Sequence, residues 1–89
     1  MNKGKFKQIV EEGRNRGKLF MVVKIETEGN PGPEIIVNGS ENFAAKTAYY
    51  DKAYNDDMEL IAAKNNGKSV RISDVIMTSN FNDLNWFAY

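Results

Sequence analysis

The chain has 89 residues, with no cysteine, no histidine, and twelve basic side chains balanced by twelve acidic ones. A chain of this length forms one domain, residues 1–89, close to the lower size limit for a protein held together by its core alone. The lack of cysteine excludes disulfides and thiolate zinc sites, and the lack of histidine removes the commonest general base and metal ligand.

The N-terminal half begins with a predicted helix and a predicted β-hairpin. Apolar or small residues recur near the N-terminus at intervals of three or four, or side by side: Phe6, Ile9, Val10 and Gly13. This spacing predicts a helix over residues 4–13. Alternating apolar residues then predict strands over 18–27 and 34–38. The proline- and glycine-rich segment between them predicts a hairpin loop.

A longer helix is predicted over residues 41–56, with Ser40 as its N-cap. Aromatic and β-branched residues form one stripe along this helix: Phe43, Thr47, Tyr50 and Tyr54. Such a stripe is more typical of core packing than of a cofactor site. Tyr49 lies about 100° from Tyr50 around the helix, so we expect the Tyr49 hydroxyl group to reach solvent.

Two further strands are predicted over residues 58–63 and 69–77, joined by a hairpin turn at Asn66-Gly67. The segment Ala62–Ser69, "AAKNNGKS", also fits a relaxed phosphate-binding loop. That loop requires a helix directly after it, whereas the residues that follow are β-branched and alternate like a strand. We therefore interpret the segment as a turn and not as a nucleotide site.

The C-terminal segment carries many large apolar side chains: Phe81, Leu84, Trp86, Phe87 and Tyr89. It is predicted to form a short helix. The segment either folds back over the core or forms an exposed docking element. We favour folding back because a small core needs every large side chain. Trp86 and Tyr89 would still act as interface anchors if they lie at the edge.

The predicted elements define a small α+β domain in the order α-β-β-α-β-β, with a short C-terminal helix. The sheet is expected to be largely antiparallel, with the longer helix on one face. The order of the strands within the sheet is not determined by the sequence.

Charge is distributed unevenly along the chain. Residues 1–18 carry six basic and two acidic groups, whereas residues 26–59 carry eight acidic and two basic groups. Such an asymmetry either steers a charged partner or is paired within the fold and solvated.

The candidate partner-binding surface combines Tyr49 with the acidic residues near the end of the second helix: Asp51, Asp56, Asp57 and Glu59. Exposed negative charge is unfavourable at a helix C-terminus by about 0.3–1 kcal/mol. Three explanations are open: a turn capped by Asn55 or Asp56, a surface that contacts a basic partner, or a cation site. The turn is the default, and the spacing lacks the pattern of an EF-hand loop. We therefore predict no metal and no cofactor.

An alternative is nucleic-acid binding by the basic N-terminal residues: Lys3, Lys5, Lys7, Arg14, Arg16 and Lys18. With Phe6 between them, these side chains could contact phosphates. The overall isoelectric point is acidic, however, and no RNP-like or GXXG signature is present. Nucleic acid is therefore the less favoured partner.

Composition also argues against catalysis and against a membrane. Without histidine or cysteine, a catalyst would need carboxylate, lysine, tyrosine or serine groups with shifted pKa values, and no motif calls for them. The longest apolar run, Leu19–Val23, is far shorter than the ~20 residues of a membrane span, and no secretory signal precedes it. We expect a cytoplasmic protein that is not an enzyme.

Three segments carry a resemblance to a group of proteins: "GNPGPEIIVN", "YYDKAYNDD" and "NDLNWF". Over residues 18–86 the chain resembles small uncharacterised proteins of phages and prophages from low-GC Gram-positive bacteria. The resemblance brings no catalytic or binding residue with it. It implies a phage accessory protein that binds and inhibits a host macromolecule, such as part of a defence system. A nucleic-acid-binding accessory protein and a self-associating structural phage protein are the alternatives.

Overall fold

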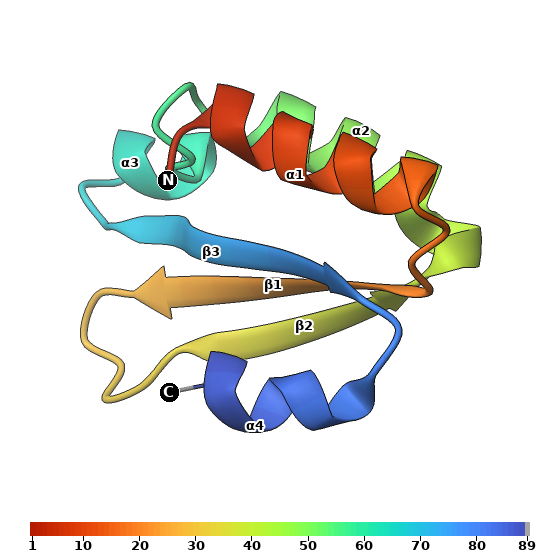
Figure 1. Ribbon diagram of the computed structural model, residues 1–89. Helices are drawn as coiled ribbons and strands as arrows, with labels where there is room; N and C mark the ends of the chain where they lie inside the picture. Colours follow the sequence, from red (N-terminus) through yellow and green to blue (C-terminus); the bar gives the residue numbers. More distant parts are fainter. Residues whose placement is uncertain (89) are drawn as a thin grey trace.

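The computed structural model describes residues 1–88, which form a small α+β domain as the sequence predicts (Figure 1). The elements follow one another as α1 (Lys3–Asn15), β1 (Phe20–Thr27), β2 (Glu34–Gly39), the 3-10 turn η1 (Ser40–Asn42), α2 (Phe43–Ala53), α3 (Ile61–Asn65), β3 (Val70–Thr78), the 3-10 turn η2 (Phe81–Asp83) and α4 (Leu84–Phe87).

The described strands form one antiparallel sheet in the order β2-β1-β3. β1 is the central strand, and its Val22 lies opposite Val37 of β2 and Ile76 of β3. The pairing of β1 with β2 is regular. The pairing of β1 with β3 shifts register between Lys24 and Ile25, which marks a β-bulge in the outer strand.

The two faces of the sheet are covered by different parts of the chain. Figure 1 shows α1 and α2 together on one side of the sheet and α4 on the other. Successive strand residues point to opposite faces. Met21 and Val23 accordingly belong to the core beneath the long helices, whereas Phe20 and Lys24 contact aromatic rings of the C-terminal segment. We call these surfaces the helix face and the tail face.

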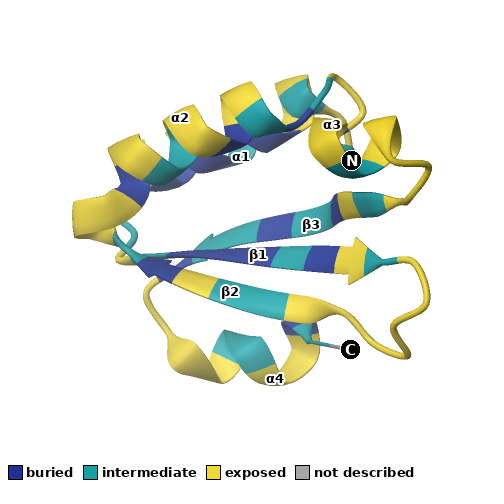
Figure 2. Ribbon diagram, turned by 180° about the vertical axis from the view of Figure 1, so that it is seen from behind, coloured by how far each residue is buried: buried dark blue, intermediate teal, exposed yellow. Residues whose placement is uncertain are grey.

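The core lies between the helix face and the two long helices, where Figure 2 shows the buried residues. It contains Phe6, Val10, Met21, Val23, Ile25, Phe43, Tyr50, Tyr54, Met58, Ile72 and Val75. The predicted aromatic stripe of the second helix is confirmed as core at Phe43 and Tyr50, Thr47 is half-buried, and Tyr54 is buried just beyond the end of the helix. The rings of Phe6 and Tyr50 meet edge to face, with 5.6 Å between their centroids, and so connect α1 to α2.

The first helix is slightly longer than the predicted range of 4–13. Asn2 caps its N-terminus, because the Asn2 side chain accepts a hydrogen bond of 2.8 Å from the backbone N–H of Lys5. Gly13 lies against β3 so closely that a Cβ atom at this position would overlap the side chain of Met77. Glycine therefore sets how near α1 can approach the sheet.

The second helix starts later and ends earlier than the predicted range of 41–56. Ser40 is not its N-cap, because Ser40 opens the turn η1 and no side chain caps α2. Tyr54 leaves the helical conformation, with φ −113° and ψ 145°, and pairs with Leu60 in an isolated β-bridge. The acidic residues that follow therefore lie in a turn beyond the helix.

The predicted strand over residues 58–63 is wrong, and so is the hairpin built on it. Glu59 and Leu60 form isolated bridges, and the chain then enters the short helix α3. The reason is local, since alanine and lysine at positions 62–64 favour a helix. The strand predicted over 69–77 is confirmed as β3. The observed order is α-β-β-α-α-β, followed by α4.

Gly67 has the positive φ angle that the hairpin prediction requires, 73°, but it ends a helix instead. The backbone N–H of Gly67 donates to the carbonyl oxygen of Lys64, and that of Lys68 donates to Ala63. These bonds satisfy the last carbonyl groups of α3, as a left-handed C-cap does. A strand, not a helix, follows Ser69, so the phosphate-binding-loop interpretation fails here as predicted.

The C-terminal segment folds back on the tail face, which confirms the favoured prediction. Phe87 is only 1 % exposed, and Lys24 Nζ lies 4.8 Å from the centroid of its ring. Trp86 is 60 % exposed, so the same segment buries one aromatic ring and presents another to solvent. The predicted anchor Tyr89 lies outside the described residues.

A small polar network holds this segment in place. The buried Thr78 hydroxyl group donates a hydrogen bond of 2.5 Å to the carboxylate of Asp83. The other carboxylate oxygen of Asp83 accepts a bond of 3.2 Å from Trp86 Nε1. The Thr78 bond, followed by the Trp86 bond, lowers the pKa of Asp83. The network connects the end of β3 to α4 and fixes the indole of Trp86 at the surface.

Candidate functional site

The first acidic residue of the predicted surface, Asp51, is engaged within the protein. Its carboxylate lies 2.7 Å from Lys7 Nζ and 3.7 Å from Lys3 Nζ. The hydrogen bond from Lys7 is the main reason that the pKa of Asp51 is lowered. Lys3 Nζ also donates to the carbonyl oxygens of Asp51, at 2.7 Å, and of Tyr54, at 2.6 Å. These contacts join the start of α1 to the end of α2.

The turn after α2 is organised by Asn55, as the turn interpretation predicts. Asn55 Oδ1 accepts hydrogen bonds from the backbone N–H groups of Asp57, at 3.0 Å, and Glu59, at 2.9 Å. Met58 lies between them with φ 58° and is fully buried in the core. The turn is therefore pinned by its backbone and by Met58, while the side chains of Asp56 and Asp57 are exposed.

Glu59 is paired with α3. Its Oε1 lies 2.9 Å from Lys64 Nζ and accepts a bond of 3.1 Å from Asn55 Nδ2. The Lys64 bond, and next the Asn55 bond, lower the pKa of Glu59. Of the four predicted acidic residues, Asp56 and Asp57 are the two whose carboxylates make no ion pair within residues 1–88.

The structure adds an apolar groove beside Tyr49, which we call the α2–α3 groove. It has a volume of about 610 Å³, and its lining includes Tyr49, Lys52, Ala53, Leu60, Ile61 and Asn65. Tyr49 is 50 % exposed, which confirms its predicted position at the surface, and Ile61 is 40 % exposed. Ile61 was missed by the sequence analysis because its segment was predicted as a strand.

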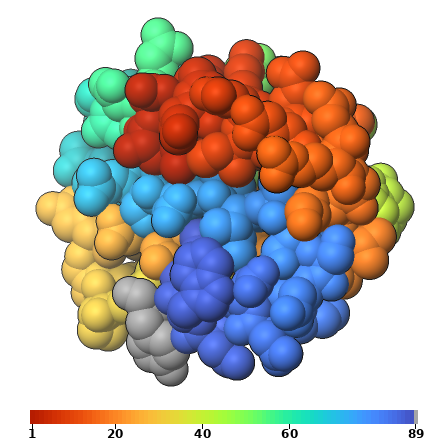
Figure 3. All heavy atoms as spheres, viewed as in Figure 1, coloured from red at the N-terminus to blue at the C-terminus, as the bar shows by residue number. Residues whose placement is uncertain are grey.

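The six basic residues proposed for nucleic-acid binding do not share one face of α1. Lys7 and Arg14 line a groove toward α2, whereas Arg16 and Lys18 line a hollow toward β3. Figure 3 shows the second flank, where α1 lies along β3. Lys5 is about 200° around the helix from Lys7 and cannot join the first pair. The basic charge is split between two flanks, which weakens the case for a continuous phosphate-binding surface.

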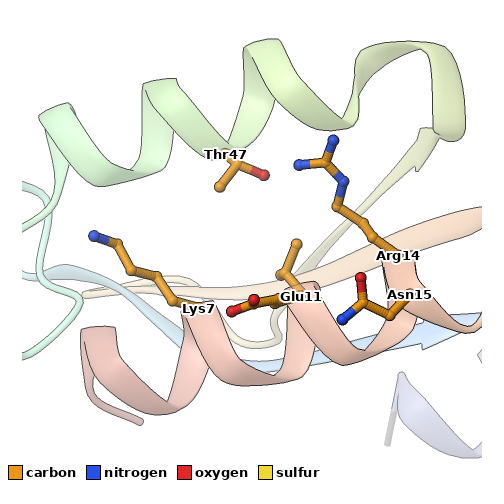
Figure 4. Close-up of a pocket in the computed structure, with 6 residues that line it drawn as sticks. Lys7, Glu11, Arg14, Asn15 and Thr47 are labelled. Carbon is orange, nitrogen blue, oxygen red and sulfur yellow. The ribbon is translucent and has the colours of Figure 1, made fainter.

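The groove between α1 and α2 has a volume of about 560 Å³ and carries mixed charge (Figure 4). Its lining includes Lys7, Glu11 and Arg14 from α1 and Thr47 from α2. Figure 4 shows Arg14 reaching from α1 toward α2. Because Glu11 shares the groove and Asp51 already pairs with Lys7, no ligand of one charge is favoured there. We assign no ligand to this groove.

We expect Lys3→Ala to lower the free energy of unfolding by about 1–2 kcal/mol, since its ammonium group bonds to two carbonyl oxygens at the end of α2. The Lys3 side chain is only 18 % exposed. Lys5→Ala is the matched control: Lys5 is exposed, without an ion pair in the described part of the chain, so the change should stay within about 0.5 kcal/mol. Urea denaturation measures both. Equal costs would contradict a specific role for Lys3.

Neither a metal site nor a membrane span is found in the part of the chain that the structure describes. No group of three or more carboxylate side chains in residues 1–88 is placed to hold a metal ion. No helix in this range is long and apolar enough to cross a bilayer. Comparisons with family models, with curated proteins and with solved structures find no match. The choice of function therefore depends on geometry.

Proposed function

We propose that this chain is a small, non-enzymatic protein-binding module that contacts its partner through the α2–α3 groove and the acidic turn beside it. The observation that carries the proposal is the exposure of Tyr49 and Ile61, two large apolar side chains at 50 % and 40 %, in one groove. Exposed apolar surfaces with a polar rim are typical of protein interaction sites. Tyrosine is also enriched among the residues that dominate binding energy.

The lining of the groove defines the kind of partner that fits. Tyr49, Leu60 and Ile61 favour a large apolar side chain. Asp56 and Asp57 come just before α3 in the chain and carry exposed carboxylates without ion pairs in the described structure. We therefore propose a partner with an apolar anchor and neighbouring basic residues. The apolar contact would supply most of the affinity, and the charges would steer association.

The two buried tyrosines with raised pKa values support a non-catalytic role. Burial raises the pKa of Tyr50, and it raises the pKa of Tyr54 to about 12. A phenol that ionises so far above neutral pH is a poor general base. Both side chains are buried in the core, where the Tyr50 ring packs against that of Tyr49 with 5.4 Å between their centroids. We attribute these shifts to packing and not to a reaction.

A module without catalytic groups would act by covering a functional surface of its partner. The resemblance to small phage proteins extends the proposal to an accessory protein that inhibits a host macromolecule, for example in a defence system. A protein partner is favoured over nucleic acid because the basic side chains of α1 are divided between two flanks.

Affinity capture from a lysate of a low-GC Gram-positive bacterium, with and without nuclease, tests the proposal. We expect Tyr49→Ala to reduce capture of the protein partner at least tenfold, the loss expected for a central aromatic anchor. Asp56→Asn with Asp57→Asn should leave the melting temperature unchanged. The same pair should weaken capture by an amount that shrinks as salt increases.

Trp86→Ala is the matched control, because Trp86 is an aromatic residue with 60 % exposure in α4, on the opposite side of the sheet. Capture should be unchanged in this variant. Loss of capture with Trp86→Ala, but not with Tyr49→Ala, would move the binding surface to the C-terminal segment. Capture abolished by nuclease would overturn the protein partner in favour of nucleic acid.

A further inference from the structure

The two outer edges of the sheet are protected very differently. The backbone of residues 58–60 covers the first part of the outer edge of β3, since Leu60 N donates to Val70 O at 2.7 Å and Ile72 N donates to Met58 O at 2.9 Å. β3 is also interrupted by the bulge. Covering segments and bulges are among the devices by which proteins stop strand edges from pairing with other chains.

β2 has neither device within the described structure. Its pairing with β1 is regular from Gly39 to Glu34, and the strand contains no lysine and no proline. Glu34, at the first position, is its one charged residue. Within residues 1–88, the backbone groups on the outer edge of β2 form no bonds to another segment. Val37, in the middle of the strand, is 41 % exposed on the tail face. Such an edge is a template for a further strand.

We propose that a second copy of this chain pairs antiparallel along the outer edge of β2 and joins the two sheets into one around a two-fold axis. In a two-fold interface each contact occurs twice, with the roles of the copies exchanged. Side chains directly opposite each other lie on the same face of a sheet. At the two-fold axis, one residue of β2 therefore lies opposite the same residue of the second copy. The two residues in the middle of β2 that could take this position are Ile36 and Val37.

Ile36 is the better choice for the residue at the axis, because it places polar side chains opposite polar ones and apolar side chains opposite apolar ones. Glu34 then lies opposite Asn38 of the second copy, and Ile35 lies opposite Val37 of the second copy. Asn38 is 5 % exposed; its side chain lies near the Tyr50 hydroxyl group, but Nδ2 makes no hydrogen bond of good geometry to it or to another described residue. A carboxylate across the strand pair is a suitable acceptor for that donor. With Val37 at the axis, Ile35 would instead face Gly39, and Glu34 would have no partner on the opposing strand.

These matches also explain why the second copy fits better than an unrelated strand. The edge needs an acceptor opposite Asn38 and an apolar side chain opposite Val37, and β2 itself offers both, in Glu34 and Ile35. The arrangement keeps the two Glu34 carboxylates at opposite ends of the paired strands. Like charges therefore do not face each other, which would otherwise weaken a strand pair.

Sedimentation velocity and light scattering over a concentration series test this self-association. The wild-type chain should pass from monomer to dimer. Val37→Lys should raise the dissociation constant of the dimer about tenfold or more, because lysine on an exposed edge opposes strand pairing. Leu19→Lys is the control, since it makes the same charge change at an apolar residue that is 51 % exposed outside β2. A monomer at every concentration, or equal weakening by both variants, would overturn the proposal.

Cross-linking tests the register without depending on the folding of Val37→Lys. The chain has no cysteine, so single cysteines are clean probes. A mixture of Ile35→Cys and Val37→Cys chains, treated with a mild oxidant, should give a disulfide-linked dimer, because directly opposed residues lie within disulfide reach. Each variant alone should not. Self-linking of Val37→Cys, or no linking in any combination, would overturn the Ile36 register. The capture experiment is also repeated with Val37→Lys to keep this test separate from the α2–α3 groove. Val37→Lys should weaken self-association and leave capture of the proposed host partner unchanged.

Discussion

Gly13→Ala is expected to lower the free energy of unfolding by about 2 kcal/mol, although alanine is preferred over glycine inside a helix by about 1 kcal/mol. The added Cβ atom would overlap Cβ and Cγ of Met77 on β3. Met77 Cβ is fixed by the backbone of its strand, so α1 or β3 must move to make room. α1 carries Phe6 and Val10 into the core, and any shift of the helix loosens their packing as well.

Gly4→Ala on the same helix is the matched control for Gly13→Ala. A Cβ atom at Gly4 would meet only Asn2 Oδ1, at 3.5 Å, which is an ordinary contact. The change should raise the free energy of unfolding by up to about 1 kcal/mol, through helix propensity and a less flexible unfolded chain. Urea denaturation should therefore give opposite signs for the two variants. Stabilisation by both would contradict a close approach of α1 to β3 at Gly13.

Phe87→Ala is expected to lower the free energy of unfolding by about 3 kcal/mol or more. Phe87 is 1 % exposed, and Val22, on the tail face of β1, is also 1 % exposed. The change leaves a cavity beside the sheet and removes the ring that Lys24 Nζ contacts at 4.8 Å. Without its buried ring, the short helix α4 would be held on the tail face only by the Thr78–Asp83 hydrogen bond and the contact of Phe81 with Phe20, so Val22 would become more accessible to water.

Trp86→Ala provides the comparison for Phe87→Ala on the neighbouring residue. Trp86 is 60 % exposed, and its indole N–H bonds to Asp83 at 3.2 Å. Its removal should cost less than about 1 kcal/mol, as expected for an exposed hydrogen bond. Thermal unfolding and exchange of the backbone N–H groups of β1 both report the difference. If the two variants lost equal stability, the C-terminal segment would not be held by Phe87.

The elements with long, regular patterns were predicted well. The stripe that contains Phe43 and Tyr50 indicates a helix because the spacing fits 3.6 residues per turn, and both side chains are buried in α2. β1 and β3 are eight and nine residues long and rich in β-branched and other apolar side chains, which indicates strands even though the bulge interrupts the alternation of β3. The α+β class follows from these elements together.

The segment from residue 58 to residue 67 was predicted wrongly because its local sequence is compatible both with a β-hairpin and with a short helix. Gly67 with a positive φ angle suits a hairpin turn and a helix C-cap equally well. The choice depends on neighbours that are distant in sequence. Residues 58–60 bond to the outer edge of β3, which leaves the alanines that follow free to form α3. No local pattern contains that information.

The acidic cluster shows the same limit for a site. Asp51, Asp56, Asp57 and Glu59 are close in sequence, but Asp51 pairs with α1 and Glu59 pairs with α3. The partners Lys7 and Lys64 could not be identified from spacing alone, because the first pairing joins elements more than forty residues apart. Tyr49, by contrast, was placed correctly at the surface by the helical wheel. That Ile61 lines the same groove as Tyr49 could be recognised only from the structure, because it depends on the helix α3.

The central position of β1 has a consequence for the order in which the domain forms. β1 is joined to β2 by a loop of six residues, 28–33, whereas Phe20 pairs with Thr78, 58 positions further along. Closing the short loop is faster, so the β1–β2 hairpin forms before β3 is added. Until Val70 and the residues after it have left the ribosome, β1 keeps one open edge and an uncovered tail face. A nascent chain that stalls at this stage is therefore the species most prone to aggregate, and steady synthesis of β3 and the C-terminal segment protects the protein.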